Sequence, residues 1–157
     1  MQTKRNRLRL LCGLLLVLNL CFIWGNSMLP GKISGELSNG LLLWLSQLLG
    51  DAWEMSLFLL RKLAHFSEFA MLGLLLGWMF LLWDQKGVHR FTMPLLCGMV
   101  CACVDETIQV FVPQRGPSVI DVWIDTAGVM AGIMLLLLGK AILEKKNTAI
   151  QLEETKL

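Results

Sequence analysis

The sequence predicts an all-α fold: a polytopic membrane protein with a four-transmembrane-helix bundle and an extracytoplasmic interfacial or re-entrant segment between the first and second helices. Hydrophobic residues make up 55% of the 157 residues and charged residues 17%, whereas soluble domains have about 45–50% apolar and about 25% charged residues. The apolar residues gather in runs that match the roughly 20 helical residues needed to cross a bilayer. These runs lack the alternation of barrel strands, so helices are expected to satisfy the backbone in lipid.

The chain is predicted to form a single membrane domain over residues 1–157. Its small net charge of +2 is dispersed, and nucleic-acid binding would need Lys and Arg clustered on one face. We therefore expect no nucleic-acid partner. The four predicted spans cover residues 8–28, 63–83, 91–112 and 119–139.

The first predicted span follows a basic stretch and lacks a clean small-residue cleavage site, so we expect a retained anchor rather than a signal peptide. An extracytoplasmic loop over residues 25–62 comes next and contains two short apolar runs, 41–49 and 52–60. Neither run is long enough to span the bilayer, and Trp44 and Trp53 favour a position at the headgroup level. The charged tail, residues 140–157, is expected to be cytoplasmic.

The distribution of Lys and Arg predicts the orientation, because positive charge is retained on the cytoplasmic side. With four spans, both termini lie on one side of the membrane, together with the loop that contains Lys86 and Arg90. The opposite side holds four of the 14 Lys and Arg residues: Lys32, Arg61, Lys62 and Arg115. Both termini are therefore predicted to be cytoplasmic.

Ionisable and polar residues occur inside three of the predicted spans, where they are costly and by default mark a functional or paired internal site. All lie at the span ends that are predicted to face outward. Helical spacing places them in stripes, since residues three and four apart are neighbours on a helix surface. The residues in question are His65 and Glu68, then Asp105, Glu106 and Gln109, then Asp121 and Asp125.

Pairs of small residues four apart lie on the same spans, a pattern that lets membrane helices approach closely. They are Gly73/Gly77, Gly98/Ala102 and Gly128/Gly132. Because these pairs continue the acidic stripes, the carboxylates are expected to face the bundle interior rather than lipid.

Clustered carboxylates in a low dielectric must be protonated, paired with cations or bound to a metal ion. Arg61, Lys62, His65 and Arg115 are the compensating donors. A hard divalent cation held by Asp and Glu oxygens stays open, whereas a zinc site of Cys101, Cys103 and His65 has no recognised spacing. No metal and no cofactor are assigned, and no nucleotide-binding motif is present.

An ordered set of motifs over about half of the chain resembles the VanZ-like family of small bacterial membrane proteins. The motifs are RKLAHFSEF at 61–69 with Leu72-Gly73, Asp105-Glu106-x-x-Gln109, Pro113-x-Arg115, and Asp121-x-x-x-Asp125-x-x-Gly128. The chain departs from the family at Phe69, where Tyr is frequent, at Ile108, where His is common, and at Gln114, where Gly is frequent. The first two departures remove polar groups from the site.

The resemblance implies a protein of the bacterial cytoplasmic (inner) membrane that acts on the envelope from its outer face, because the family's namesake is associated with reduced susceptibility to teicoplanin. The expected partners are membrane lipids or lipid-linked cell-wall molecules, or the lipoglycopeptide antibiotic itself. The oligomeric state is not assigned.

Whether the protein is an enzyme stays open at this point. In an enzymatic version, the catalytic residues are His65, Glu68, Asp105, Glu106 and Gln109, with general acid or base work by His65 and one acid. Lys62, Arg115, Asp121 and Asp125 would bind the substrate. In a non-enzymatic version, the same cluster stabilises the bundle while the loop 25–62 binds a lipid, the antibiotic or a partner protein. A small transporter is a third alternative, but the inner halves of the spans are almost purely apolar.

Overall fold

The computed structural model describes residues 2–49 and 56–154, and every regular element in these ranges is an α-helix. All of these helices except the second are long and apolar enough to cross a membrane. This confirms the predicted all-helical fold with four spans. The helices are α1 (Gln2–Ser27), α2 (Gly31–Leu49), α3 (Leu57–Leu82), α4 (His89–Val110) and α5 (Val119–Glu154).

The helices extend beyond the predicted spans, most of all at the starts of α1 and α3 and at the end of α5. Helix α3 begins at Leu57 rather than at residue 63, because the Ser56 hydroxyl caps it by accepting a hydrogen bond of 3.2 Å from the Leu59 amide. The end of the apolar run 52–60 therefore belongs to a span. Helix α5 continues past residue 139 to Glu154, since Ala, Leu, Glu and Lys in the charged stretch favour helix.

The segment between α1 and α3 is partly helical. The apolar run 41–49 lies within α2, and its interfacial position stays a prediction. Trp53 and the first part of the run 52–60 lie outside the described residues.

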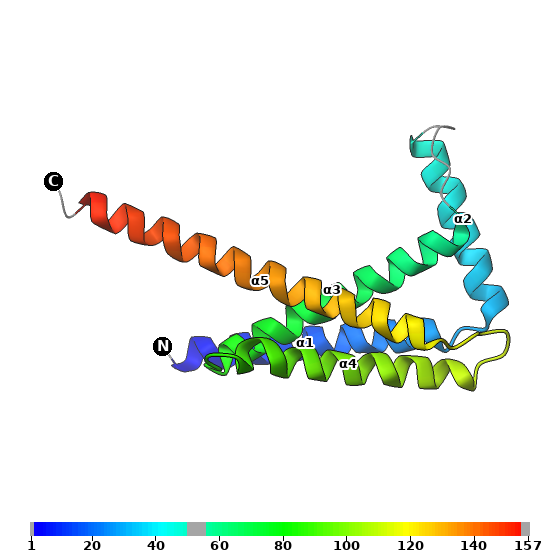
Figure 1. Ribbon diagram of the computed structural model, residues 1–157, viewed down its shortest axis with the longest axis horizontal. Helices are drawn as coiled ribbons and strands as arrows, with labels where there is room; N and C mark the ends of the chain where they lie inside the picture. Colours follow the sequence, from blue (N-terminus) through cyan, green and yellow to red (C-terminus); the bar gives the residue numbers. More distant parts are fainter. Residues whose placement is uncertain (1, 50–55, 155–157) are drawn as a thin grey trace.

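Helix α3 is the centre of the bundle, because it packs against each of the other helices. Figure 1 shows that α3 and α5 cross while α1 and α4 run alongside them, and that both termini lie at the same end. Helix α2 projects from the bundle at the opposite end, where it contacts α3. The buried core includes Ile23, Phe69, Ala102 and Ile133, which come from α1, α3, α4 and α5.

Glycines bring α3 and α5 into backbone contact. A Cβ atom at Gly132 would lie 2.0 Å from the Ala70 carbonyl oxygen, and one at Gly128 would lie 2.4 Å from the Phe66 carbonyl oxygen. Gly73 on α3 meets α5 in the same way. The prediction that the small-residue faces are packing faces is confirmed, and larger side chains at these positions would force the helices apart.

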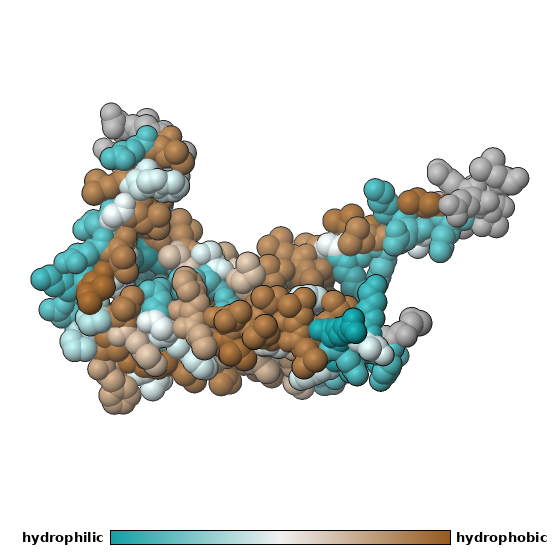
Figure 2. Space-filling view, turned by 180° about the vertical axis from the view of Figure 1, so that it is seen from behind, coloured by the Kyte–Doolittle hydropathy of each residue, from teal (hydrophilic) through white to brown (hydrophobic). Residues whose placement is uncertain are grey.

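At the end of the bundle that holds the termini, arginines of α1 bind the end of α3. The Arg9 guanidinium donates to the Leu82 carbonyl at 2.8 and 3.2 Å, and Arg5 forms an ion pair with Asp84. The Arg9 contact satisfies a carbonyl group that the helix C-terminus leaves without a partner. Figure 2 shows hydrophobic residues over the middle of the bundle and hydrophilic residues gathered towards its two ends, as expected for a membrane protein.

We expect Gly132→Ala to lower the melting temperature of the detergent-purified protein, because the added methyl group would collide with the α3 backbone. Gly139→Ala is the matched control on the same helix, since a Cβ there meets nothing within 4 Å. The control should match or slightly exceed the wild type, as Ala favours helix over Gly by about 1 kcal/mol. Equal melting temperatures for the two variants would contradict the close crossing of α3 and α5.

Candidate functional site

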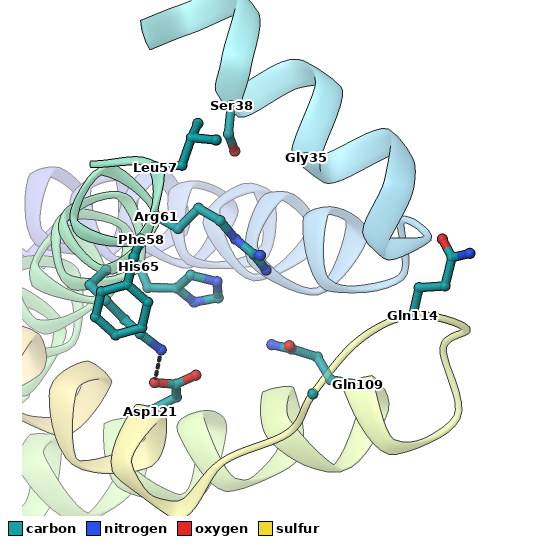
Figure 3. A pocket seen from close by; sticks show the side chains of 11 residues that line it. Gly35, Ser38, Leu57, Phe58, Arg61, His65, Gln109, Gln114 and Asp121 are labelled. Atoms are coloured by element: carbon teal, nitrogen blue, oxygen red, sulfur yellow. Dashed lines mark hydrogen bonds and ion pairs between the residues drawn. The ribbon is translucent and has the colours of Figure 1, made fainter. Parts of the chain in front are cut away.

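A pocket of about 420 Å³ opens at the end of the bundle from which α2 projects. Figure 3 shows that side chains of α3, α4 and α5 point into it, including His65, Gln109 and Asp121. Apolar side chains, Leu57 and Phe58, form part of the wall. The remaining lining residues are Gly35 and Ser38 of α2, Arg61 and Lys62 of α3, and Gln114 and Gly116 of the connection before α5.

Arg61 borders two cavities. It lines the pocket just described and a second pocket of about 180 Å³ that also contacts Asn26 and Glu68. In the part of the chain that the structure describes, Arg61 forms no hydrogen bond or ion pair. From the sequence, Arg61 was expected only to compensate the charge of the acids. Its position between two pockets could not be predicted, because residues of α2 form part of both pockets and no motif predicts how α2 packs.

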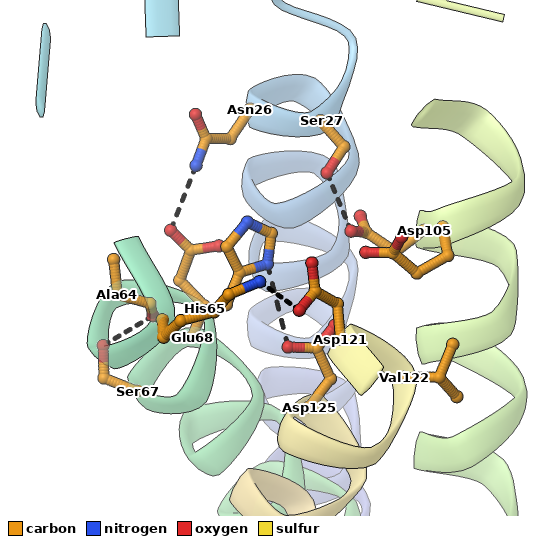
Figure 4. A network of polar contacts seen from close by, with 12 residues as sticks. Asn26, Ser27, Ala64, His65, Ser67, Glu68, Asp105, Asp121, Val122 and Asp125 are labelled. Atoms are coloured by element: carbon orange, nitrogen blue, oxygen red, sulfur yellow. Dashed lines mark hydrogen bonds and ion pairs between the residues drawn. The ribbon is translucent and has the colours of Figure 1, made fainter. Parts of the chain in front are cut away.

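Behind the pocket, polar side chains from α1, α3, α4 and α5 converge (Figure 4). Asp105 lies at the centre and is fully buried. Its Oδ2 accepts hydrogen bonds from the Ser27 hydroxyl at 2.8 Å and from the Gln109 amide at 3.0 Å. Its Oδ1 is buried without a hydrogen-bond partner among the described residues.

Asn26 and Ser27 at the end of α1 are site residues that sequence reasoning missed. The Asn26 side-chain amide donates to Glu68 at 3.2 Å, and Ser27 donates to Asp105. Both lie at the C-terminal end of the first predicted span, at the same level as the acids of the other spans. Their depth along the span could have indicated that they belong to the site. They were not considered because neither side chain is ionisable.

Glu106 and Gln109 connect helices to one another. Glu106 accepts a hydrogen bond of 2.8 Å from the Ser118 backbone amide, just before the first residue of α5. The amide of Gln109 donates to Glu106 at 3.2 Å and to the Ser27 hydroxyl at 3.3 Å. A carboxylate at a helix N-terminus is favourable because of the unpaired amides and the helix dipole. Both residues therefore hold α4 against its neighbours.

Two contacts join α3 to the first turns of α5. Lys62 forms an ion pair with Asp121, and its ammonium group lies 5.1 Å from the centre of the Phe58 ring. One turn further along α3, the Nδ1 atom of His65 lies 3.7 Å from the Oδ1 atom of Asp125, which is fully buried. The ligating atoms of His65, Asp105 and Asp125 all lie within 4.8 Å of one another.

Arg115 has a different position from the one that the sequence predicts. Its guanidinium donates to the backbone carbonyls of Asn26 at 2.7 Å and of Leu29 at 3.0 Å. It therefore caps the C-terminal end of α1 and forms no ion pair with any described residue. Burial, followed by the charge of Arg61, lowers the pKa of Arg115, although a guanidinium keeps its proton in proteins.

The connection before α5 also fixes the start of α2. The Gly31 amide donates to the Pro113 carbonyl at 3.1 Å, and a Cβ atom at Gly31 would lie 1.9 Å from the Gln114 carbonyl oxygen. Gln114 has a φ of 60°. This left-handed conformation favours glycine, and the chain holds a Gln there.

The structure thus brings the predicted site residues to one end of the bundle but gives them different partners. His65, Gln109, Lys62 and Asp121 line the larger pocket, and Glu68 lines the smaller one. Asp105, Glu106 and Asp125 line neither of these two pockets, and Arg115 lies on the α1 carbonyls.

Together, the fold and the site define a helical protein with four candidate membrane spans, a buried acidic cluster and a pocket at one end. The family described as VanZ/LLP1 matches residues 12–140, and the chain belongs to this family. Comparisons with curated proteins and with solved structures give no match.

We expect Glu106→Gln to destabilise the protein by about 1 kcal/mol, because one of its two acceptor oxygens and its charge at the start of α5 are lost. Glu36→Gln makes the same chemical change on an exposed residue of α2 and should change stability by less than about 0.5 kcal/mol. Chemical unfolding of both purified variants measures the difference. A Glu106→Gln variant as stable as Glu36→Gln would show that Glu106 does not support the start of α5.

Proposed function

We propose that the protein acts at the outer face of the bacterial cytoplasmic membrane and binds the anionic headgroup of a surface lipid or lipid-linked cell-wall molecule. Through this binding it would lower susceptibility to lipoglycopeptides such as teicoplanin. The observation that carries the proposal is Arg61, a cation that faces two pockets and has no partner among the described residues. Membership of the VanZ/LLP1 family supports the same function.

The chemistry of the larger pocket fits such a headgroup. A guanidinium presents a planar set of donors that matches phosphate and carboxylate oxygens. The other pocket cation, Lys62, is already neutralised by Asp121, so Arg61 is the group that an anion would meet. Leu57 and Phe58 supply an apolar wall, which suits the first carbons of an acyl chain.

A second candidate is a binding protein without catalysis, and the contacts of three predicted site residues favour it. Glu106, Gln109 and Arg115 are engaged in hydrogen bonds that join helices. In this version, these residues position the bundle while the pocket alone performs the function. In an enzymatic version, by contrast, catalysis would be confined to the groups that remain, His65, Asp105 and Asp125.

We expect the wild type, expressed in a sensitive Gram-positive host, to raise the minimum inhibitory concentration of teicoplanin but not that of vancomycin. Arg61→Gln at equal membrane abundance should lose this protection, because a lost charge-assisted hydrogen bond of about 1.5–3 kcal/mol weakens binding at least roughly tenfold. Lys32→Gln is the control, since Lys32 is an exposed cation of α2 that lines neither pocket.

Protection by Arg61→Gln equal to that of the wild type would remove Arg61 from the function. Protection by no variant, the wild type included, would mean that this member of the family does not share the phenotype of the namesake. Binding of phosphatidylglycerol against phosphatidylcholine, measured by native mass spectrometry, would then test the pocket directly.

The orientation can be tested with C-terminal fusions. Both termini lie at one end of the bundle, and the excess of Lys and Arg there predicts that this end is cytoplasmic. We expect a green fluorescent protein fused after residue 157 to be fluorescent and alkaline phosphatase at the same place to be inactive. The opposite pattern would place the pocket on the cytoplasmic side and exclude an action from the outer face.

A further inference from the structure

Side chains from three helices leave buried polar atoms without partners at one point. His65 Nδ1, Asp105 Oδ1 and both carboxylate oxygens of Asp125 are buried and form no hydrogen bond with any described residue. Asp105 and Asp125 are fully buried. Burying a carboxylate without a partner is costly, so a group that satisfies these atoms together is expected.

We propose that His65, Asp105 and Asp125 form a binding site for a divalent transition-metal cation between α3, α4 and α5. Their ligating atoms lie within 4.8 Å of one another, whereas ligands at about 2.1 Å around a tetrahedral Zn²⁺ lie about 3.4 Å apart. Small side-chain rotations therefore close the three groups around an ion. Two carboxylates also neutralise a doubly charged cation.

The ligand types select the class of metal. One imidazole with two carboxylates is typical of Zn²⁺, Mn²⁺ or Fe²⁺, whereas Mg²⁺ and Ca²⁺ prefer sites built from oxygen alone. Three protein ligands leave coordination positions for water or for an oxygen atom of another molecule. His65 lines the larger pocket, so an ion bound there would lie next to the pocket.

The surroundings of Asp105 support the assignment. Ser27 and Gln109 both donate to Oδ2 and leave Oδ1 free, as expected for a ligating carboxylate that outer-shell donors orient. The nearby cations do not satisfy the cluster, because Lys62 pairs with Asp121 and Arg115 binds backbone carbonyls. Of the remaining acids nearby, Glu106 accepts from Ser118, and Glu68 accepts from Asn26 through Oε1 while its Oε2 is also buried without a partner among the described residues.

The alternative to a metal is a charged His65 beside Asp125, across the 3.7 Å that separate them. That arrangement satisfies neither Asp105 Oδ1 nor the second oxygen of Asp125. One ion would satisfy the unpartnered atoms of His65, Asp105 and Asp125 together. This inference depends on the three side chains and not on the proposed function, and metal content tests it separately from any effect on teicoplanin.

The test uses the full chain purified in detergent, treated with a chelator and then equilibrated with Zn²⁺, Mn²⁺, Mg²⁺ or Ca²⁺. We expect about one Zn²⁺ or Mn²⁺ per chain by elemental analysis and a melting temperature that rises with Zn²⁺ concentration, because a ligand of the folded state stabilises it. A wild type that binds no transition metal and shows no such rise, or that binds only Mg²⁺ or Ca²⁺, would overturn the proposal.

Variants locate the ion. Loss of an outer-shell partner costs about 10- to 100-fold in metal affinity, so Ser27→Ala should weaken Zn²⁺ binding about tenfold, and Asp125→Asn, which removes a ligand, by at least as much. Glu36→Gln is the matched control, the same chemical class of change on an exposed acid of α2 outside the cluster, and should keep the wild-type affinity. Wild-type affinity in Asp125→Asn, or equal losses in Glu36→Gln and Ser27→Ala, would contradict the site.

Discussion

The close crossing of α3 and α5 is the constraint on which the rest of the structure depends. Gly128 lies one turn after Asp125, and the carbonyl that it contacts belongs to Phe66, the residue after His65. Backbone contact at this point leaves the His65 and Asp125 side chains 3.7 Å apart. A membrane bundle gains little from hydrophobic burial between helices, so the shape of these glycine faces sets the geometry of the polar cluster beside them.

At both ends of the bundle, an arginine side chain donates hydrogen bonds to the free carbonyl groups of a helix C-terminus. Arg9 binds the last carbonyl of α3, and Arg115 binds carbonyls at the end of α1. At the start of α5, Glu106 performs the opposite task and accepts from a backbone amide. A helix end in a low dielectric needs hydrogen-bond partners for its free backbone groups. Glu106 and Arg115, which the sequence placed among the candidate site residues, supply such partners and so stabilise the bundle. Among the described residues that line the larger pocket, Arg61 is a cation without an ion pair, and behind the pocket the cluster of His65, Asp105 and Asp125 has buried atoms without partners.

Sequence patterns predicted a large part of this. Hydropathy gave the four spans, helical spacing gave the packing faces, and the position of the acids along the spans placed the cluster at one end. The start of α3 and the length of α5 were less predictable, because a cap at Ser56 and helix propensity beyond the membrane extend both helices. Asn26 and Ser27 were missed because uncharged polar residues at a span end are common without a role.

What the sequence by itself determined is therefore the class of protein and the end of the bundle where its chemistry is concentrated, since hydropathy and periodicity are properties of neighbouring residues. Only the tertiary structure decided which acid meets which donor. Arg115 meets the end of α1 rather than a carboxylate, and His65 meets Asp105 and Asp125. Those partners are 40 or more residues apart in the chain, and the rotation of each helix about its axis, which packing fixes, brings them together.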